Sequence, residues 1–178
     1  MYRTSPLVAV LLALSACDHP APTAPSLLRT EVPITSSYRA RGTIGTAPRC
    51  DALGLLYVSL EGGGVESHVG RYTITNSHCL NPATGEFTAG IFSKTTASGD
   101  KLRGTYSGTS TVIQPPAPVG IFAVDGQLAF DGGSGRFADA TGSQRMQGTQ
   151  TSDFSQADVP TTVELRFVGT ISTVGSTP

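Results

Sequence analysis

Residues 132–142 read GGSGRFADATG, and this glycine-rich stretch decides the fold. Its four glycines favour a tight reversal over a helix, because glycine adopts positive φ without steric cost and lets backbones approach closely. The segments on either side, 119–130 and 142–151, have the composition of β-strands. We therefore expect a corner at which a β-sheet turns back on itself. The residues expected to build it are Gly132, Gly133, Gly135, Arg136, Phe137 and Gly142.

Outward from this corner, the chain divides into eight segments with strand character. Turn signals separate several of them: Gly62-Gly63-Gly64 before the third, Ser98-Gly99-Asp100 before the fifth, and a proline-rich break at 115–118 before the sixth. The predicted strands cover residues 37–44, 55–61, 65–75, 86–96, 101–112, 119–130, 142–151 and 162–172.

Apolar and polar residues alternate most clearly in the fifth, sixth and eighth predicted strands. Glycines repeatedly fall on the apolar side, where a missing side chain relieves crowding inside a small barrel and lets a strand bend. Eight antiparallel strands of this kind close most naturally into an all-β barrel, which removes the sheet edges; an open sandwich is the alternative. The apolar faces consist of Leu102, Gly104, Tyr106 and Gly108, of Phe122, Val124, Gly126, Leu128 and Phe130, and of Val163, Leu165, Phe167, Gly169 and Ile171.

Three stretches carry a resemblance to a known family: the glycine-rich corner, GDKLRGTYSGT at 99–109 and SHVGRYT at 67–73. Together they resemble small secreted bacterial proteins of the allene oxide cyclase-like barrel group. The dirigent proteins of plants are similar in their barrel and in a comparable glycine-rich turn. The resemblance covers residues 63–173 and implies an allene oxide cyclase-like or calycin-like barrel. It also implies a homotrimer, since the plant groups form trimers, but it assigns no reaction.

The first 17 residues have the pattern of a bacterial lipoprotein signal peptide, with Arg3, an apolar run at 7–14 and Leu-Ser-Ala-Cys ending at Cys17. The apolar run is shorter than the ~20 residues that a membrane-spanning helix needs. Since the last four residues resemble a lipobox, we expect Cys17 to carry acyl chains such as palmitate. These chains would hold the protein to a membrane of the bacterial cell envelope, on its periplasmic or cell-surface face. An ordinary secretory signal is the alternative.

The rest of the chain divides into three parts. Residues 18–36 are rich in Pro, Ala, Ser and Thr, which predicts a disordered tether. Residues 37–174 form the predicted barrel domain, and 175–178 are a short tail. With 12 basic and 13 acidic residues and no basic stripe, the chain does not have the charge pattern of a nucleic-acid-binding protein.

An up-and-down barrel places alternate connections at the same end. The connections at 46–54, 77–85, 113–118 and 152–161 therefore share one end, and these longer loops are where binding is expected. Cys50 and Cys79 lie in the first two of these loops, and export favours a disulfide between them over two free thiols.

Few residues suggest chemistry. If Tyr72 points inward, alternation brings Glu66 and His68 inward as well, and a carboxylate beside an imidazole is an acid–base device. The alternative register leaves His68 structural or on the surface. Tyr106 is the third candidate catalytic residue. His78 adjoins Cys79 but makes a poor metal pair with it, so neither a metal site nor a cofactor is expected.

The sequence therefore favours a non-catalytic envelope lipoprotein that binds an unidentified small apolar ligand or a partner at the loop end. Two alternatives remain open. One is a cyclase, isomerase or dirigent-like enzyme that acts on a small apolar substrate inside the barrel, with Glu66, His68 and Tyr106 as its candidates. The other is a structural or adhesive surface protein.

Overall fold

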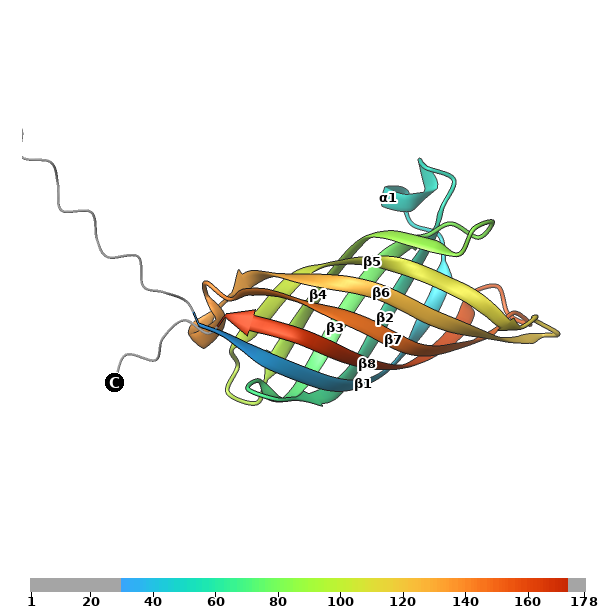
Figure 1. Ribbon diagram of the computed structural model, residues 1–178. Coiled ribbons are helices and arrows are strands. Elements are labelled where there is room, and N and C mark those ends of the chain that lie inside the picture. The colour runs from blue at the N-terminus through green and yellow to red at the C-terminus, as the bar shows by residue number, and fades with distance from the viewer. Residues whose placement is uncertain (1–29, 173–178) are drawn as a thin grey trace, which may run out of the picture.

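The computed structural model describes residues 30–172, which form a closed barrel of eight antiparallel strands (Figure 1). This confirms the predicted all-β eight-stranded barrel. Each strand pairs with its neighbours in sequence, and β8 pairs with β1. The strands are β1 (Glu31–Gly45), β2 (Leu56–Glu66), β3 (Gly70–Leu80), β4 (Glu86–Thr96), β5 (Lys101–Gln114), β6 (Val119–Gly133), β7 (Thr141–Asp153) and β8 (Val159–Ser172).

Closure gives every strand two hydrogen-bonded neighbours and leaves no edge exposed. Residues 30–172 therefore contain a complete sheet with its own core. The predicted signal peptide, Cys17, most of the predicted tether and the C-terminal tail lie outside the described residues. Residues 31–36, expected in the tether, belong to β1, where Glu31 pairs with Ser172 of β8.

The connections separate into two ends of the barrel (Figure 1). The loop end carries the connections 46–55, 81–85, 115–118 and 154–158, including the short helix α1 (Pro48–Asp51). The turn end carries the connections 67–69, 97–100 and 134–140, together with the start of β1 and the end of β8. This is the distribution that an up-and-down order predicts.

One predicted turn is wrong. Gly62, Gly63 and Gly64 lie inside β2, and the reversal into β3 occurs five residues later, at 67–69. Gly62 and Gly64 serve a different purpose, because they leave room for side chains inside the barrel. A Cβ on Gly64 would lie 2.6 Å from the hydroxyl oxygen of Tyr72, and one on Gly62 would lie 2.6 Å from the Cβ of Ala40.

The glycine-rich stretch forms the connection between β6 and β7 and includes the 3-10 helix η1 (Gly135–Phe137). Gly132, Gly135 and Gly142 have φ of 100°, 60° and 133°, a region that other residues rarely adopt. Phe137 is buried and belongs to the core. Arg136 donates from Nη2 to the backbone oxygen of Val69, 2.6 Å away, so this corner is tied to the turn between β2 and β3.

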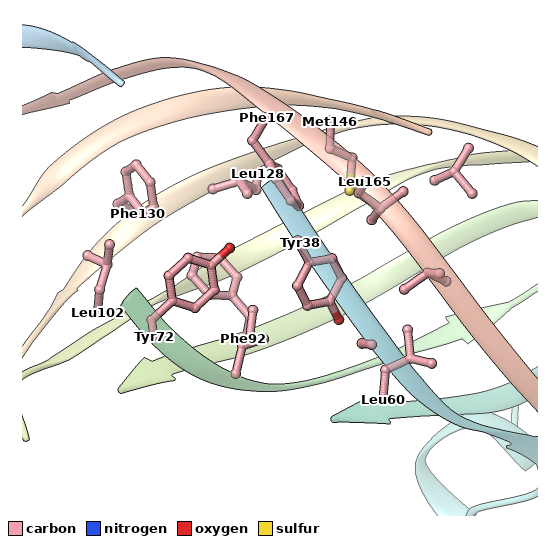
Figure 2. Close-up of a cluster of buried hydrophobic side chains, with 14 of the residues drawn as sticks. Tyr38, Leu60, Tyr72, Phe92, Leu102, Leu128, Phe130, Met146, Leu165 and Phe167 are labelled. Atoms are coloured by element: carbon pink, nitrogen blue, oxygen red, sulfur yellow. The ribbon is translucent and has the colours of Figure 1, made fainter. Parts of the chain in front are cut away.

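The core fills the inside of the barrel with inward-facing side chains from all eight strands (Figure 2). The alternating faces predicted for β5, β6 and β8 point into it, and so do Tyr38 of β1 and Tyr72 of β3. Tyr38 and Phe167 meet edge to face, with ring centroids 5.9 Å apart, and Phe92 and Phe130 do so at 6.1 Å.

Candidate functional site

The half of the barrel interior nearer the loop end contains a hydrogen-bonded pair, His78 and Tyr106. His78 Nδ1 lies 2.8 Å from the Tyr106 hydroxyl, and the two rings meet edge to face. Phe87 packs against both rings, with centroids 4.9 Å from His78 and 6.1 Å from Tyr106. Tyr106, a candidate from the sequence, therefore points inward and is paired with a histidine that sequence reasoning had considered only as a metal ligand.

Burial controls the protonation of this pair. Desolvation, with a smaller contribution from the positive charge of Arg49, lowers the pKa of His78 to about 3. Burial also raises the pKa of Tyr106 well above its usual value. At neutral pH both groups are uncharged, so they can exchange hydrogen bonds but contribute no net charge to the interior.

A cavity of about 40 Å³ lies in the barrel interior beside this pair. Typical ligand pockets measure roughly 300–1,000 Å³, so this space admits only a few atoms. Most of its lining is apolar. The polar residues along it are Asn76, His78, Lys94, Tyr106, Ser110 and Gln150.

A larger hollow of about 590 Å³ lies at the loop end, which we call the mouth. It shares Ser110 and Gln150 with the interior cavity, so the two spaces adjoin. Among the described residues that line the mouth, none is Asp, Glu, Lys, Arg or His. Its large apolar side chains are Ile44, Leu56, Leu80, Val112, Phe122, Phe154 and Val159.

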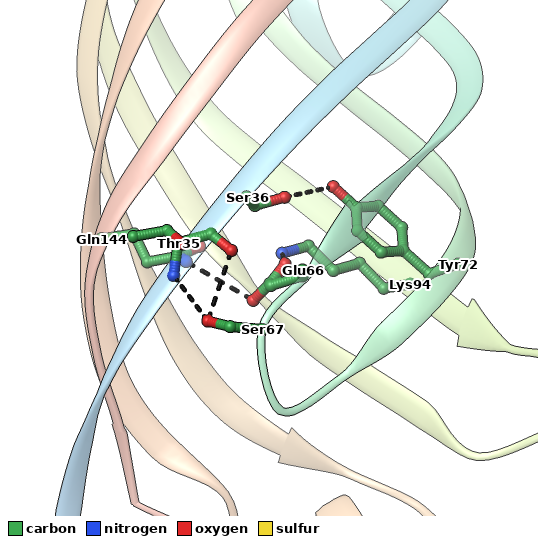
Figure 3. Close-up of polar contacts among 7 residues, drawn as sticks. All are labelled: Thr35, Ser36, Glu66, Ser67, Tyr72, Lys94 and Gln144. Carbon is green, nitrogen blue, oxygen red and sulfur yellow. Dashed lines mark hydrogen bonds and ion pairs between the residues drawn. The ribbon is translucent and has the colours of Figure 1, made fainter.

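Toward the turn end, the interior holds an ion pair between Lys94 of β4 and Glu66 of β2 (Figure 3). The side chains of Lys94 and Glu66 are 1% and 0% exposed. Gln144 of β7 approaches the other carboxylate oxygen, with its Nε2 3.4 Å from Glu66 Oε1. The two charges thus neutralise each other within the core.

Aromatic rings surround the Lys94 ammonium group. Its Nζ lies 4.9 Å from the ring centroid of Tyr72, 5.5 Å from those of Phe130 and Phe167, and 5.7 Å from that of Phe92. Burial lowers the pKa of Lys94, and the Glu66 carboxylate partly offsets this effect. The rings and the carboxylate together replace the water that a lysine normally keeps.

The inward pair of Glu66 and His68, one of the two arrangements that the sequence allowed, is not formed; His68 is on the surface, as in the other. Glu66 is buried as that prediction required, but the strand ends there and His68 lies exposed in the turn with φ of 65°. Lys94 takes the place beside the carboxylate. The described residues therefore do not form the carboxylate–imidazole pair that the first arrangement would have given.

The predicted disulfide between Cys50 and Cys79 is confirmed, with a Cα–Cα distance of 5.5 Å. It joins α1 to the end of β3 at the loop end. Arg49, next to Cys50, donates to the backbone oxygen of Ala89 at 3.1 Å and lies over the ring of Tyr57. These contacts hold the 46–55 loop against the barrel wall.

Another hollow, of about 860 Å³, lies on the outer wall across β7, β8, β1, β2, β3 and β4. Arg39, Arg71 and Arg166 border it, and Arg39 pairs with Glu164 at 3.2 Å. It is the outer side of a continuous sheet, so a molecule there would keep one face in water. The mouth is the better candidate, because a molecule held there is enclosed by loops from several strands and is desolvated by apolar side chains.

Two features are absent from residues 30–172. No helix there has both the length and the apolarity to cross a bilayer. No three His, Cys, Asp or Glu side chains in that range gather where they could hold a metal ion. Comparison of the chain with protein-family models, with curated proteins and with solved structures finds no match.

Proposed function

We propose that this protein is a lipid-anchored protein of the bacterial envelope whose barrel binds a small, neutral, largely apolar molecule at the mouth. The observation that carries the proposal is the uncharged, apolar hollow of about 590 Å³ at the loop end. Its volume lies within the usual range for small-molecule sites. The disulfide and the Arg49 contacts support one side of this end.

The interior supports binding at the mouth rather than deep in the barrel. The inner cavity of about 40 Å³ is too small for a whole substrate, because side chains fill the rest of the lumen. An enzyme that enclosed its substrate in the barrel would have to open this core. A ligand seated in the mouth needs no such rearrangement.

Charge supports a neutral ligand. The mouth has no ionisable side chain among its described lining residues, Lys94 and Glu66 neutralise each other, and His78 is uncharged at neutral pH. A charged ligand would lose its hydration without gaining a partner, which is costly.

Binding can be tested with N-phenyl-1-naphthylamine, a neutral apolar dye whose fluorescence rises in apolar surroundings. Residues 30–178, exported and oxidised, should bind the dye at one site per chain. Val112→Glu places a carboxylate at the mouth and should weaken binding by about tenfold or more, since 1.4 kcal/mol corresponds to a factor of ten.

Val168→Glu is the matched control. Val168 and Val112 are both exposed valines, at 63% and 54%, but Val168 does not line the mouth. The control variant should bind the dye as the unmodified protein does. Equal binding by all three proteins, or no binding by the unmodified protein, would reject the mouth as a ligand site.

The lipid anchor needs its own test. The full chain expressed in a bacterium should incorporate labelled palmitate, and Cys17→Ala should abolish the label. A labelled Cys17→Ala protein, or an unlabelled natural chain, would contradict the anchor without affecting the mouth.

A further inference from the structure

The connection between β5 and β6 is exposed and uncharged. Residues 111–119, which we call the hairpin tip, are all exposed, and they project beyond the other connections of the loop end (Figure 1). No residue between Arg103 and Asp125 is charged. Half of the large apolar side chains that are exposed among residues 30–172 lie at this tip or against it: Val112, Ile113, Val119 and Phe154.

These apolar side chains lie on more than one side of the hairpin tip. Val112 and Phe154 line the mouth, whereas Ile113 and Val119 do not. Clustered exposed apolar side chains mark contact with another apolar surface. A protein partner approaches from one direction and would leave part of the tip in water. A lipid bilayer surrounds a projecting tip and covers all of it.

The backbone of the hairpin tip suits the apolar part of a bilayer, where an N–H or C=O group without a partner is costly. Residues 115–118 read PPAP, and proline has no N–H, so Ala117 is the only one of the four with a backbone donor. The backbone oxygen of Pro118 already accepts a hydrogen bond from Phe154 N at 3.0 Å. Insertion would therefore leave few backbone groups without a partner.

Charge sets the depth of insertion and the kind of membrane. Asp153 of β7 pairs with Val119, and a hydrogen bond from the backbone N–H of Ser155 lowers the pKa of its carboxyl group. Asp153 is therefore ionised at neutral pH and stays in water, so only residues 113–118 can enter. Three residues on each side of the tip rise about 10 Å, close to the roughly 5–10 Å over which interfacial segments are buried. Without a basic residue, the tip is not attracted to anionic headgroups.

The proposed anchor does not prevent this contact. β1 begins at the turn end, opposite the hairpin tip, and Cys17 precedes β1 in the chain. The thirteen residues between Cys17 and Glu31 can reach about 45 Å when extended. A strand of 14 residues, such as β5, rises about the same distance. The anchor and the hairpin tip can therefore contact the same membrane.

We propose that the hairpin tip inserts into the surface of a lipid bilayer whose lipids carry no net charge. Residues 113–118 enter the interfacial layer, and Asp153 stays on its water side. This contact goes beyond the proposed ligand site at the mouth and does not need the lipid on Cys17.

Insertion can be observed with a single fluorescent reporter, because the chain contains no tryptophan. Ile113→Trp places one at the hairpin tip, and Ile91→Trp is the matched control on β4; the two isoleucines are 60% and 51% exposed. With phosphatidylcholine vesicles, the emission of Ile113→Trp should shift to shorter wavelength and be quenched by lipids with brominated acyl chains. The emission of Ile91→Trp should do neither.

Binding without a reporter is measured by sedimentation of residues 30–178 with phosphatidylcholine vesicles. The unmodified protein should bind to the same extent at low and high salt concentration, since no charge is involved. Ile113→Asp should raise the lipid concentration needed for half-binding by about tenfold or more, because an ionised group resists entry into the bilayer. Ile91→Asp, the control, should change that concentration by about twofold or less.

The outcomes separate this proposal from the ligand site. Ile113 does not line the mouth, so Ile113→Asp should bind N-phenyl-1-naphthylamine as the unmodified protein does, which also shows that it is folded. Three results would overturn insertion: no binding to neutral vesicles, binding only to anionic vesicles with release by salt, or equal loss in both aspartate variants. A dimer that Ile113→Asp converts to a monomer, without vesicle binding, would make the tip a contact between copies and overturn it as well.

Discussion

Lys94 of β4 and Glu66 of β2 form an ion pair inside the barrel, although β3 separates their strands in the sheet. Both side chains are almost completely buried. Breaking such a pair leaves one charge without a partner in the core, which typically costs about 3–5 kcal/mol. We therefore expect Lys94→Met and Glu66→Gln each to lower the free energy of unfolding by about that amount, as measured by urea denaturation.

The double variant Lys94→Met/Glu66→Gln separates pairing from packing. It should be less destabilised than the sum of the two single variants, since neither charge is left alone. Arg39 and Glu164 provide a matched surface pair, 80% and 63% exposed. Replacing them with Met and Gln should cost about 1 kcal/mol or less. Additive losses at Lys94 and Glu66 would show that the two charges are not coupled.

His78 should make the stability depend on pH. Its pKa falls from 6.5 to about 3 on folding, so between these values the unfolded chain binds a proton that the folded protein does not. The contribution of neutral His78 is fully present above pH 6.5. It decreases by up to about 1.4 kcal/mol per pH unit as the pH falls toward 3.

His78→Asn isolates this effect, because the asparagine amide can occupy the place of Nδ1 beside Tyr106. Carboxylates contribute to acid denaturation in both proteins, so the difference between them reports His78. Between pH 6.5 and 4 the variant should lose less stability than the unmodified protein. If the free energy of unfolding changed with pH equally in the two proteins, His78 would have the same pKa in the folded and unfolded states.

The disulfide should stabilise the barrel measurably. Cys50 and Cys79 are 29 residues apart in sequence, and closing a loop of that size contributes about 3–4 kcal/mol by the chain-entropy estimate. The double variant Cys50→Ala/Cys79→Ala should lower the free energy of unfolding by that amount, and a reducing agent should do the same to the unmodified protein. The reducing agent should have no effect on the variant; if it destabilised the variant further, the effect of reduction would have a cause other than the bridge.

Gly104 of β5 lies where the sheet and the core leave no room for a methyl group. A Cβ there would lie 1.9 Å from the backbone oxygen of Ala129 and 2.7 Å from the ring of Phe92. Gly104→Ala should therefore lower the free energy of unfolding by about 1–3 kcal/mol. Gly45→Ala is the control, because its Cβ would meet only Asp158 Oδ1 at 3.3 Å, and it should change stability by about 0.5 kcal/mol or less. Equal effects would show that the glycines do not relieve crowding.

The sequence predicted the parts of the fold that follow from alternation and parity. Along β5, β6 and β8, inward and outward side chains alternate without interruption. Inward residues such as Tyr106, Leu128 and Phe167 could therefore be assigned correctly. The pairing of Cys50 with Cys79 followed from export, and the order of connections in an up-and-down barrel placed both at the same end.

Some residues of the candidate site were harder to predict because a bulge changes the facing of β4. In β4, strict alternation starting from the inward-facing Phe87 would point Ile91 into the barrel and Lys94 out of it. An irregularity between Phe87 and Gly90, where Ala89 has φ of 51°, instead turns Ile91 outward and Lys94 inward. Gly90, an isolated glycine inside the strand, is compatible with a bulge but does not show which side chains change face.

A second irregularity, between Ser77 and Cys79 of β3, lies at His78 but does not change its facing. The sequence placed His78 in a loop, so its facing was not considered. Asn76 and His78 are an even number of residues from Tyr72, so alternation points all three side chains to the same side. The predicted third strand ended at residue 75; a longer one would have placed Asn76 and His78 inside the barrel. The mouth depends on the arrangement of the loops, which alternation does not describe.

The central claim is that the mouth is a ligand site, and the most direct test is a ¹H–¹⁵N NMR titration of residues 30–178 with N-phenyl-1-naphthylamine. We expect the largest shift changes at the backbone amides of Val112, Phe122 and Phe154, with smaller changes at Tyr106 and none at Val168 on the outer wall. Changes confined to the outer wall, or no changes at saturating dye, would contradict the claim.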